Sequence, residues 1–200
     1  MSDHTGTVNG KRKLKIGDLI LAGVFAVIYL VLMTIAASGL AFIPIVYLIC
    51  PLIVGILCGP VYLLYLSKVP RTGAILILSI LMGLLLSGTA FYVFFFVVGI
   101  GILTEILLHK TGYSLKSLTH SFYLFNLTAI CPFTVLYLER DRFLASFVPY
   151  YGQEYADSFA KLAPVWIPVP QIVLALAGAF LGTMLGKALL RKHFAKAGLV

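Results

Sequence analysis

Long apolar runs, separated by short polar or charged breaks, dominate the sequence. No charged residue occurs in segments 19–67 and 72–104. Since about 20 apolar residues cross a bilayer core, each of these segments is too long for one helix and must fold back once. Small residues and prolines place the reversals at 38–44 and 87–89. The pattern therefore predicts several membrane-spanning helices.

Six helices follow from this spacing. They are expected at 16–37, 45–66, 72–87, 90–108, 117–138 and from 165 to about 187. Pro51 and Pro60 should bend the second helix, because proline lacks the backbone donor that a helix interior needs. We therefore predict an all-α integral membrane protein with one domain. Its six-helix bundle covers 16–190, with a basic N-terminal segment at 1–15 and a short tail at 191–200.

Charge indicates how this bundle is oriented. Of the 15 Lys and Arg residues, 12 fall on the side that carries both termini, and three fall on the other side. Basic residues accumulate on the cytoplasmic side of a membrane, so both termini are expected there. A chain that is 61% hydrophobic and 11% charged is not a soluble domain. The net charge of +8 is explained without a nucleic-acid partner.

One extracellular loop, 139–164, is long enough to have a structure of its own. Tyr151, Tyr155 and Phe159 recur at helical spacing, which predicts a short amphipathic helix over 150–162. This helix either anchors the loop at the membrane interface or acts as a lid over a cavity that opens to the outside. The charges around Arg140, which open the loop, are expected to be solvated.

Polar and aromatic residues gather toward the predicted extracellular ends of the helices. Tyrosine and tryptophan are common at membrane interfaces, so each alone fits an aromatic belt. Together they could line an apolar pocket with a few polar groups. The candidate substrate-binding residues are Tyr47, Tyr92, Asn126, Tyr137, Trp166 and Gln171. Asn126 could instead bond a neighbouring helix, whereas the Gln171 amide lies about one turn inside the last helix, where lipid does not favour it.

Small residues four apart allow helix backbones to approach closely in lipid. Such spacing occurs on the first helix at Ala22 and Ala26, on the second at Gly55 and Gly59, and on the last at Gly178, Gly182 and Gly186. Packing within the bundle is the interpretation for the two glycine sets. For the alanine pair, a contact with a second membrane protein is the sharper hypothesis.

No enzyme motif, nucleotide-binding motif or metal-ligand cluster occurs in the sequence. Glu105 is the one acid deep in an apolar run, and a neutralised contact near His109 and Lys110 is its simplest role. His109 and His120 flank one loop but lack further ligands for a metal. We therefore expect a protein that is not an enzyme and needs no cofactor.

The chain resembles the substrate-binding S components of energy-coupling factor (ECF) transporters, and within them the Trep_Strep family. The resemblance rests on six spans in about 200 residues, on the alanine pair, and on three segments. These are 17–20 (GDLI), 151–157 (YGQEYAD), and 185–187 (LGK) with 192–198 (KHFAKAG).

The resemblance implies a function that the residues alone do not supply. S components bind a micronutrient at the extracellular side, here a vitamin-like compound or a haem- or iron-linked nutrient. They pass it through a transmembrane coupling subunit that two separate ATPase subunits drive. The resemblance implies that this subunit docks on the first helix, at Ala22 and Ala26, and that the protein lies in a prokaryotic cell membrane. Tyr151, Tyr155 and Phe159 are the candidate lid residues above such a site. A stand-alone secondary transporter or channel is the alternative, although the sequence has neither an inverted repeat nor paired charges at mid-depth.

Overall fold

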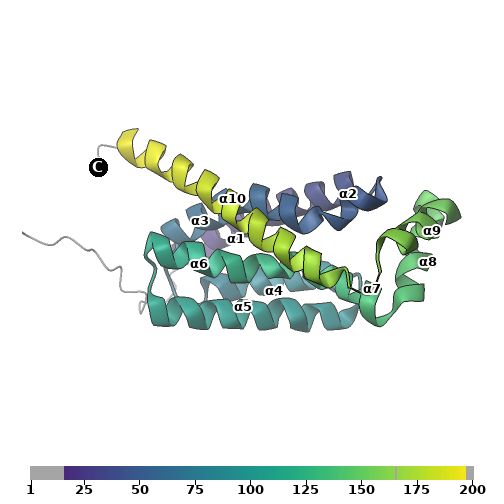
Figure 1. The fold of residues 1–200 in the computed structure, drawn as a ribbon. Coiled ribbons are helices and arrows are strands. Elements are labelled where there is room, and N and C mark those ends of the chain that lie inside the picture. Colours follow the sequence, from purple (N-terminus) through teal and green to yellow (C-terminus); the bar gives the residue numbers. More distant parts are fainter. Residues whose placement is uncertain (1–15, 165, 197–200) are drawn as a thin grey trace, which may run out of the picture.

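The computed structural model describes residues 16–164 and 166–196, which form an elongated assembly of helices (Figure 1). The helices are α1 (Ile16–Leu40), α2 (Pro44–Leu48), α3 (Cys50–Lys68), α4 (Ala74–Leu86), α5 (Phe91–Thr111), α6 (Leu115–Phe125), α7 (Thr134–Leu138), α8 (Arg140–Tyr151), α9 (Gln153–Leu162) and α10 (Pro168–Lys196). A 3₁₀ segment, Asn126–Phe133, joins α6 to α7. This part of the chain contains no strand, so the predicted all-helical class is confirmed. The predicted basic segment 1–15 lies outside the described residues.

Five of the described helical segments are long and apolar enough to cross a membrane. They are Ile16–Leu40, Cys50–Lys68, Phe91–Thr111, Leu115–Leu138 and Pro168–Arg191. The remaining predicted span, 72–87, is the shorter apolar helix α4 of 13 residues. At 1.5 Å per residue α4 is about 20 Å long, which is less than the roughly 30 Å of a hydrocarbon core. The last helix continues to Lys196, so the expected tail begins as helix.

The second predicted helix is broken rather than only bent. It is divided at Ile49 into α2 and α3, because Pro51 occupies the first turn of α3 and has no N–H to continue the ladder from α2. The N–H of Leu52 donates to the carbonyl of Ile49 at 3.0 Å, a tighter turn than the α-helical pattern. Pro60, by contrast, lies inside the continuous helix α3.

The fifth predicted helix changes geometry half-way. A Ser114 cap starts α6, and its hydroxyl accepts from the N–H of Ser117 at 3.2 Å. From Asn126 onward the turns tighten into the 3₁₀ form, and the hydroxyl of Thr128 donates to the carbonyl of Phe125 at 2.7 Å. Such side-chain bonds compete with the α-helical ladder, and Pro132 removes one donor from it.

The loop 139–164 is a hairpin of two helices, where the sequence predicted one. Gly152 separates α8 from α9. Its φ of 85° is a left-handed backbone conformation, which glycine adopts without steric cost and which ends α8. Arg140 and Asp141 belong to α8 rather than to an irregular loop; Asp141 is exposed, as expected, whereas Arg140 is half-buried. Arg140 donates to the carbonyls of Ala163 and Ala160 at 2.7 Å each, and so caps the C-terminal end of α9.

α10 crosses α3 obliquely along a line of glycines (Figure 1). A Cβ on Gly55 would lie 2.6 Å from the carbonyl carbon of Gly178, and one on Gly186 would lie 3.0 Å from Cα of Pro60. The predicted packing of these glycines within the bundle is therefore confirmed. Because glycine has no side chain, the two helix backbones can come into contact, and such close contact is how small residues stabilise helix pairs in lipid.

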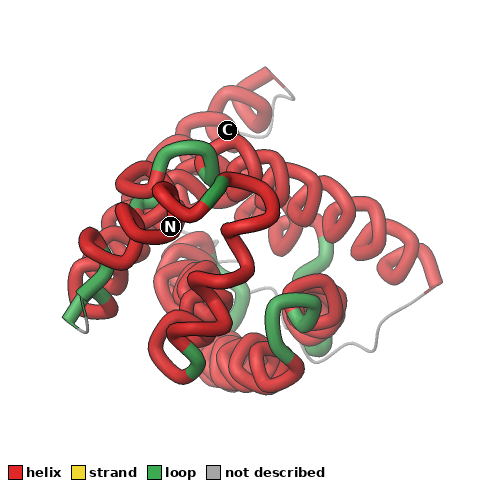
Figure 2. Tube along the Cα trace, turned by 90° about the vertical axis from the view of Figure 1, so that its right-hand side faces the viewer, coloured by secondary structure: helices red, strands yellow, loops and turns green. Residues whose placement is uncertain are grey.

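The bundle has two different ends. At one end Arg71, before α4, forms an ion pair with Asp18 of α1 at 3.4 Å, and the N–H of Gly73 donates to Glu105 at 2.8 Å. At the other end the α8–α9 hairpin lies across the helix ends, as the view from that side shows (Figure 2). The tyrosine-rich hairpin therefore covers the end opposite to the turns that carry Lys68 and Lys116.

Candidate ligand-binding site

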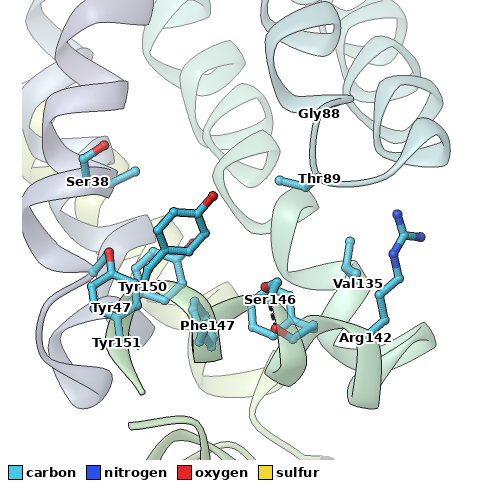
Figure 3. Close-up of a pocket in the computed structure, with 13 residues that line it drawn as sticks. Ser38, Tyr47, Gly88, Thr89, Val135, Arg142, Ser146, Phe147, Tyr150 and Tyr151 are labelled. Carbon is cyan, nitrogen blue, oxygen red and sulfur yellow. Dashed lines mark hydrogen bonds between the residues drawn. The ribbon is translucent and has the colours of Figure 1, made fainter. Parts of the chain in front are cut away.

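A cavity of about 610 Å³ lies at the end of the bundle that the hairpin covers (Figure 3). Its lining residues come from the end of α1, from α2, from the α4–α5 turn, from α7 and from α8. They are Ala37, Ser38, Ala41, Tyr47, Gly88, Thr89, Val135, Arg142, Phe143, Ser146, Phe147, Tyr150 and Tyr151. Ligand pockets commonly have volumes of about 300–1,000 Å³, so this cavity can hold an organic molecule of drug size.

Helix ends that stop short create this space. α1 ends at Leu40, after Ser38 and Gly39, and its last turn forms one wall. The short helix α4 ends at Leu86, so the turn with Gly88 and Thr89 forms the opposite wall. Figure 3 shows Ser38 and Thr89 on opposite sides of the cavity, with the residues of α8 below them.

Arg142 is the single charged residue among the described residues that line the cavity. Its Nη1 donates to Oε2 of Glu139 at 2.6 Å, and 63% of the Arg142 side chain is exposed. The hydrogen bond from Arg142, and next the hydroxyl of Tyr92, lower the pKa of the Glu139 carboxyl. Tyr92 therefore neighbours the ion pair at the rim, although it does not line the cavity.

The polar groups of the lining are mostly hydroxyls. The hydroxyl of Ser146 donates to the carbonyl of Phe143 at 2.6 Å, and that of Thr89 donates to the carbonyl of Leu86 at 2.8 Å. Both oxygens therefore remain available as acceptors. Tyr150 is 83% exposed, so most of its ring surface is available for contact with a ligand.

An aromatic cluster lies between the cavity and α9. Phe147 is its centre, with ring centroids 6.1 Å from Tyr47, 5.3 Å from Tyr155 and 5.1 Å from Phe159. Tyr151 stacks on Tyr155 at 4.7 Å. The rings of Tyr151, Tyr155 and Phe159 therefore pack in one cluster, although the predicted single helical face is divided at Gly152, with Tyr151 on α8 and the other two on α9.

The element that borders the cavity is α8, whereas the sequence assigned this role to 150–162. Of the three lid residues only Tyr151 lines the cavity, and Phe159 is fully buried in the cluster. The hydroxyl of Tyr155 donates to the carbonyl of Ala41 at 2.5 Å, which fastens α9 to the α1–α2 turn. Burial, and secondly the neighbouring Tyr151, raise the pKa of Tyr155 to about 12, so this donor keeps its proton at physiological pH.

Gln171 and Tyr137, both predicted to bind substrate, bind each other instead. The Tyr137 hydroxyl donates to Oε1 of Gln171 at 2.5 Å, and Nε2 of Gln171 donates to the carbonyl of Leu48 at 3.4 Å. That carbonyl lies beside the break between α2 and α3, where the Leu52 N–H turns to Ile49. Gln171 is 1% exposed, so its amide stabilises the break and does not face the cavity.

Asn126 has a similar structural role deeper in the bundle. Its Nδ2 donates to the carbonyls of Ala175 at 2.8 Å and Pro51 at 3.3 Å, and the side chain is fully buried. The absent side chain of Gly55 leaves it room, since a Cβ there would lie 2.6 Å from Nδ2. The interhelical bond is thus the correct interpretation of Asn126. Trp166 is 64% exposed and does not line the cavity, so Tyr47 is the one predicted substrate residue that does.

Ala22 and Ala26 lie inside the bundle. Both are fully buried in the hydrophobic core, and α1 packs on α3 and α4. The expectation that this pair contacts a second protein is therefore wrong, because α3 and α4 already cover this side of α1. A different face of α1 is exposed. The exposed face includes Ile20, Val24, Val27, Val31 and Ile35.

Glu105 contacts a turn and not the basic residues near it in sequence. Its Oε1 accepts from the Gly73 N–H and, at 3.4 Å, from the Tyr113 hydroxyl, while His109 and Lys110 are exposed. Glu105 therefore joins α5 to the start of α4, at the end away from the cavity. Among the described residues no group of His, Cys, Asp or Glu has the arrangement of a metal site.

Sequence reasoning missed the residues of α8 that line the cavity. The sequence predicts Arg142 only as one of the solvated charges that open the loop, and it predicts no role for Ser146 or Tyr150. The available signal was the spacing of Phe143, Phe147 and Tyr151, which places three aromatic rings on one helical face. That stripe starts before the segment that was assigned to the amphipathic helix.

A family model of bacterial integral membrane proteins, described as "hypothetical bacterial integral membrane protein (Trep_Strep)", matches residues 16–196. The chain belongs to this family. Together with the five apolar helices, membership identifies a multi-pass membrane protein of bacteria. Comparison with curated proteins and with solved structures gave no match.

Proposed function

We propose that this Trep_Strep protein is the substrate-capturing S component of an ECF-type importer. It binds a micronutrient, either a vitamin-like compound or a haem- or iron-linked nutrient, in the cavity beneath the α8–α9 hairpin. A transmembrane coupling subunit and two separate ATPase subunits then drive its delivery into the cell. The proposal includes six spans, with α4 as the third, and both termini in the cytoplasm.

The position of the cavity is the observation that carries this proposal. Among the described residues, the cavity lies at the end of the bundle with Arg140, Arg142 and Lys161, opposite to the turns that carry Lys68 and Lys116. Because basic residues accumulate in the cytoplasm, this end faces outward, where a nutrient is first met. Two helices of the hairpin can shield a ligand from water there.

The packing below the cavity favours capture over transport by the chain alone. The Phe147 cluster closes one side, and the α3–α10 glycine seam brings backbones into contact through the depth of the bundle. A secondary transporter places its site near the midplane, between repeats that rock about it. Here the cavity is at one end, so release to the cytoplasm requires a partner that moves the whole subunit or opens it.

The coupling subunit is expected to contact the exposed face of α1 rather than the alanine pair. Val24, Val27 and Val31 are exposed and lie on one side of that helix. This surface faces lipid when the subunit is alone. In the proposed complex, one membrane helix of the coupling subunit replaces that lipid.

Purification from native bacterial membranes in a mild detergent tests the function. A tagged chain is expected to retain a multi-span membrane protein and ATPases with nucleotide-binding motifs. Val27→Trp should reduce this retention and ATP-dependent uptake, whereas Leu103→Trp, at an exposed position of α5, serves as the matched control. Substrate uptake by the chain alone in proteoliposomes would instead establish the secondary transporter or channel.

A further inference from the structure

We infer that the ligand of this cavity is an organic anion with a flat, aromatic or conjugated body. Its acid group pairs with Arg142, and its body lies against the tyrosines of α8. This inference rests on the proposed function, since it names the class of substrate that the same site captures. The charge, the ring surfaces and the volume of the cavity carry it.

The charge comes from one side chain. Arg142 lines the cavity, and no carboxylate lies among the lining residues that the structure describes. A guanidinium has five N–H donors, and Glu139 takes one of them, at Nη1. Figure 3 shows the Arg142 head group at the wall, extending toward the turn that carries Thr89. The remaining donors can bind a carboxylate or phosphate oxygen pair.

The ring surfaces come from α2 and α8. Tyr47, Tyr150 and Tyr151 all line the cavity, and Tyr150 keeps 83% of its surface exposed. A tyrosine face buries a large apolar area while its hydroxyl still accepts and donates. A flat conjugated ligand would cover Tyr150 and bury a surface that water now contacts. The volume of about 610 Å³ admits such a body together with its acid group.

A cationic ligand fits this cavity poorly. It would meet the Arg142 guanidinium, whose carboxylate partner among the described residues, Glu139, does not line the cavity. Two further acids of the hairpin, Asp141 and Asp157, line a separate groove of about 220 Å³. That groove is formed by α8 and α9 alone. The described lining therefore presents a guanidinium and no carboxylate.

A charge series of one aromatic skeleton tests this inference. The probes are 2-naphthoate, neutral 2-naphthamide and cationic 2-naphthylmethylammonium. The purified chain is placed in nanodiscs of zwitterionic phosphatidylcholine, so that the lipid adds no net charge. Dissociation constants are measured by calorimetry or by ligand-observed NMR. We expect 2-naphthoate to bind about tenfold more tightly than 2-naphthamide, which corresponds to about 1.4 kcal/mol, and the cation to bind most weakly.

Three variants assign the preference to Arg142. Arg142→Gln should give 2-naphthoate the same affinity as 2-naphthamide. Glu139→Gln should raise the affinity for 2-naphthoate several-fold, because it frees the guanidinium. Lys161→Gln removes an exposed cation of α9 that does not line the cavity, and it should change nothing. If Arg142→Gln does not fold, Arg142→Lys keeps the charge but loses the paired donors, and it should weaken 2-naphthoate alone.

The outcomes separate this inference from the proposed function. Equal affinities for 2-naphthoate and 2-naphthamide in the unaltered chain, or no binding of either at millimolar concentration, overturn the inference. So does a preference that survives Arg142→Gln. If 2-naphthoate binds more tightly because of Arg142, but the tagged chain retains no coupling subunit, the inference holds and the importer function is rejected. If the chain retains a coupling subunit but binds 2-naphthoate and 2-naphthamide equally, the importer function holds and the inference is rejected.

Discussion

Gly59 of α3 and Gly182 of α10 meet backbone to backbone: a Cβ on Gly59 would lie 2.6 Å from the carbonyl carbon of Gly182. A Cβ on Gly182 would in turn overlap the carbonyl oxygen of Gly55. A backbone atom cannot rotate away as a flexible side chain can. The helices must therefore separate if either glycine gains a methyl group, and the contacts along the whole seam would weaken.

Gly182→Ala is accordingly expected to lower the free energy of unfolding by about 2–3 kcal/mol, the upper part of the range for overpacked cores. Unfolding by SDS titration in mixed micelles measures this. Gly99→Ala is the matched control, because a Cβ at that position of α5 has nothing within 4 Å. It should be neutral or stabilising by up to about 1 kcal/mol, since alanine favours helix. Equal effects at the two positions would contradict the close backbone contact.

The paired side chains of Tyr137 and Gln171 lead to a second prediction. Gln171→Leu leaves the Tyr137 hydroxyl and the Leu48 carbonyl without their partner, so stability should fall by about 1–2 kcal/mol. Tyr137→Phe removes one of the two bonds and should cost less. In the double variant the loss of stability should be smaller than the sum of the two single losses. The difference is the coupling energy of the pair, about 0.6 kcal/mol and at most about 1.7 kcal/mol. Unchanged stability in Gln171→Leu, combined with weaker ligand binding, would return Gln171 to the ligand site.

Gln171 also explains how far the sequence could predict the site. A buried amide in an apolar helix indicates that some polar partner exists, but not which one. Here the partner is the Leu48 carbonyl, and it needs one because Pro51 interrupts the helix beside it. The sequence identified both Gln171 and Pro51, yet their proximity depends on how α10 crosses α3. The partners of Asn126 depend in the same way on how the helices pack, because its side chain fills the space left by the missing side chain of Gly55.

The membrane helices were more predictable than the hairpin for a physical reason. A span must be long and apolar throughout, and its turns must contain the few polar residues, so segments such as 38–44 and 87–89 stand out. The hairpin mixes charges with aromatic rings at an interface, where neither property alone determines burial. Arg140 shows this best: its sequence context suggests solvent, but it caps α9.

The short helix α4 supplies a third prediction, on topology. Lys68 and Thr89 flank this helix, and both are exposed. If α4 crosses the membrane, Thr89→Cys reacts with an impermeant maleimide in intact cells, and Lys68→Cys reacts only after permeabilisation. The three native cysteines are buried, so the background from them should be low.

Two further positions orient the ends of the bundle. Glu154→Cys, in α9, should react from outside, and Lys116→Cys, in α6, should react only from inside. Reaction of Lys68→Cys and Thr89→Cys from the same side would reduce the count to five spans. It would also place the termini on opposite sides of the membrane.

The bond between Tyr155 and Ala41 gives the last prediction, because it fastens α9 over the aromatic cluster. Tyr155→Phe removes the hydroxyl but keeps the ring, so the stack on Tyr151 remains. Losing about 1 kcal/mol of local stability corresponds to about fivefold faster local opening. Amide hydrogen exchange across Gln153–Leu162 should therefore accelerate about fivefold, while exchange in α3 stays unchanged. Tyr151→Phe is the control, since no described residue forms a hydrogen bond with its hydroxyl.

If α9 also holds ligand in the cavity, Tyr155→Phe shortens the residence time of a bound probe more than it changes the association rate. Unaltered exchange would mean that ring packing alone holds α9, and the variant to examine would then be Phe147→Ala, at the centre of the cluster.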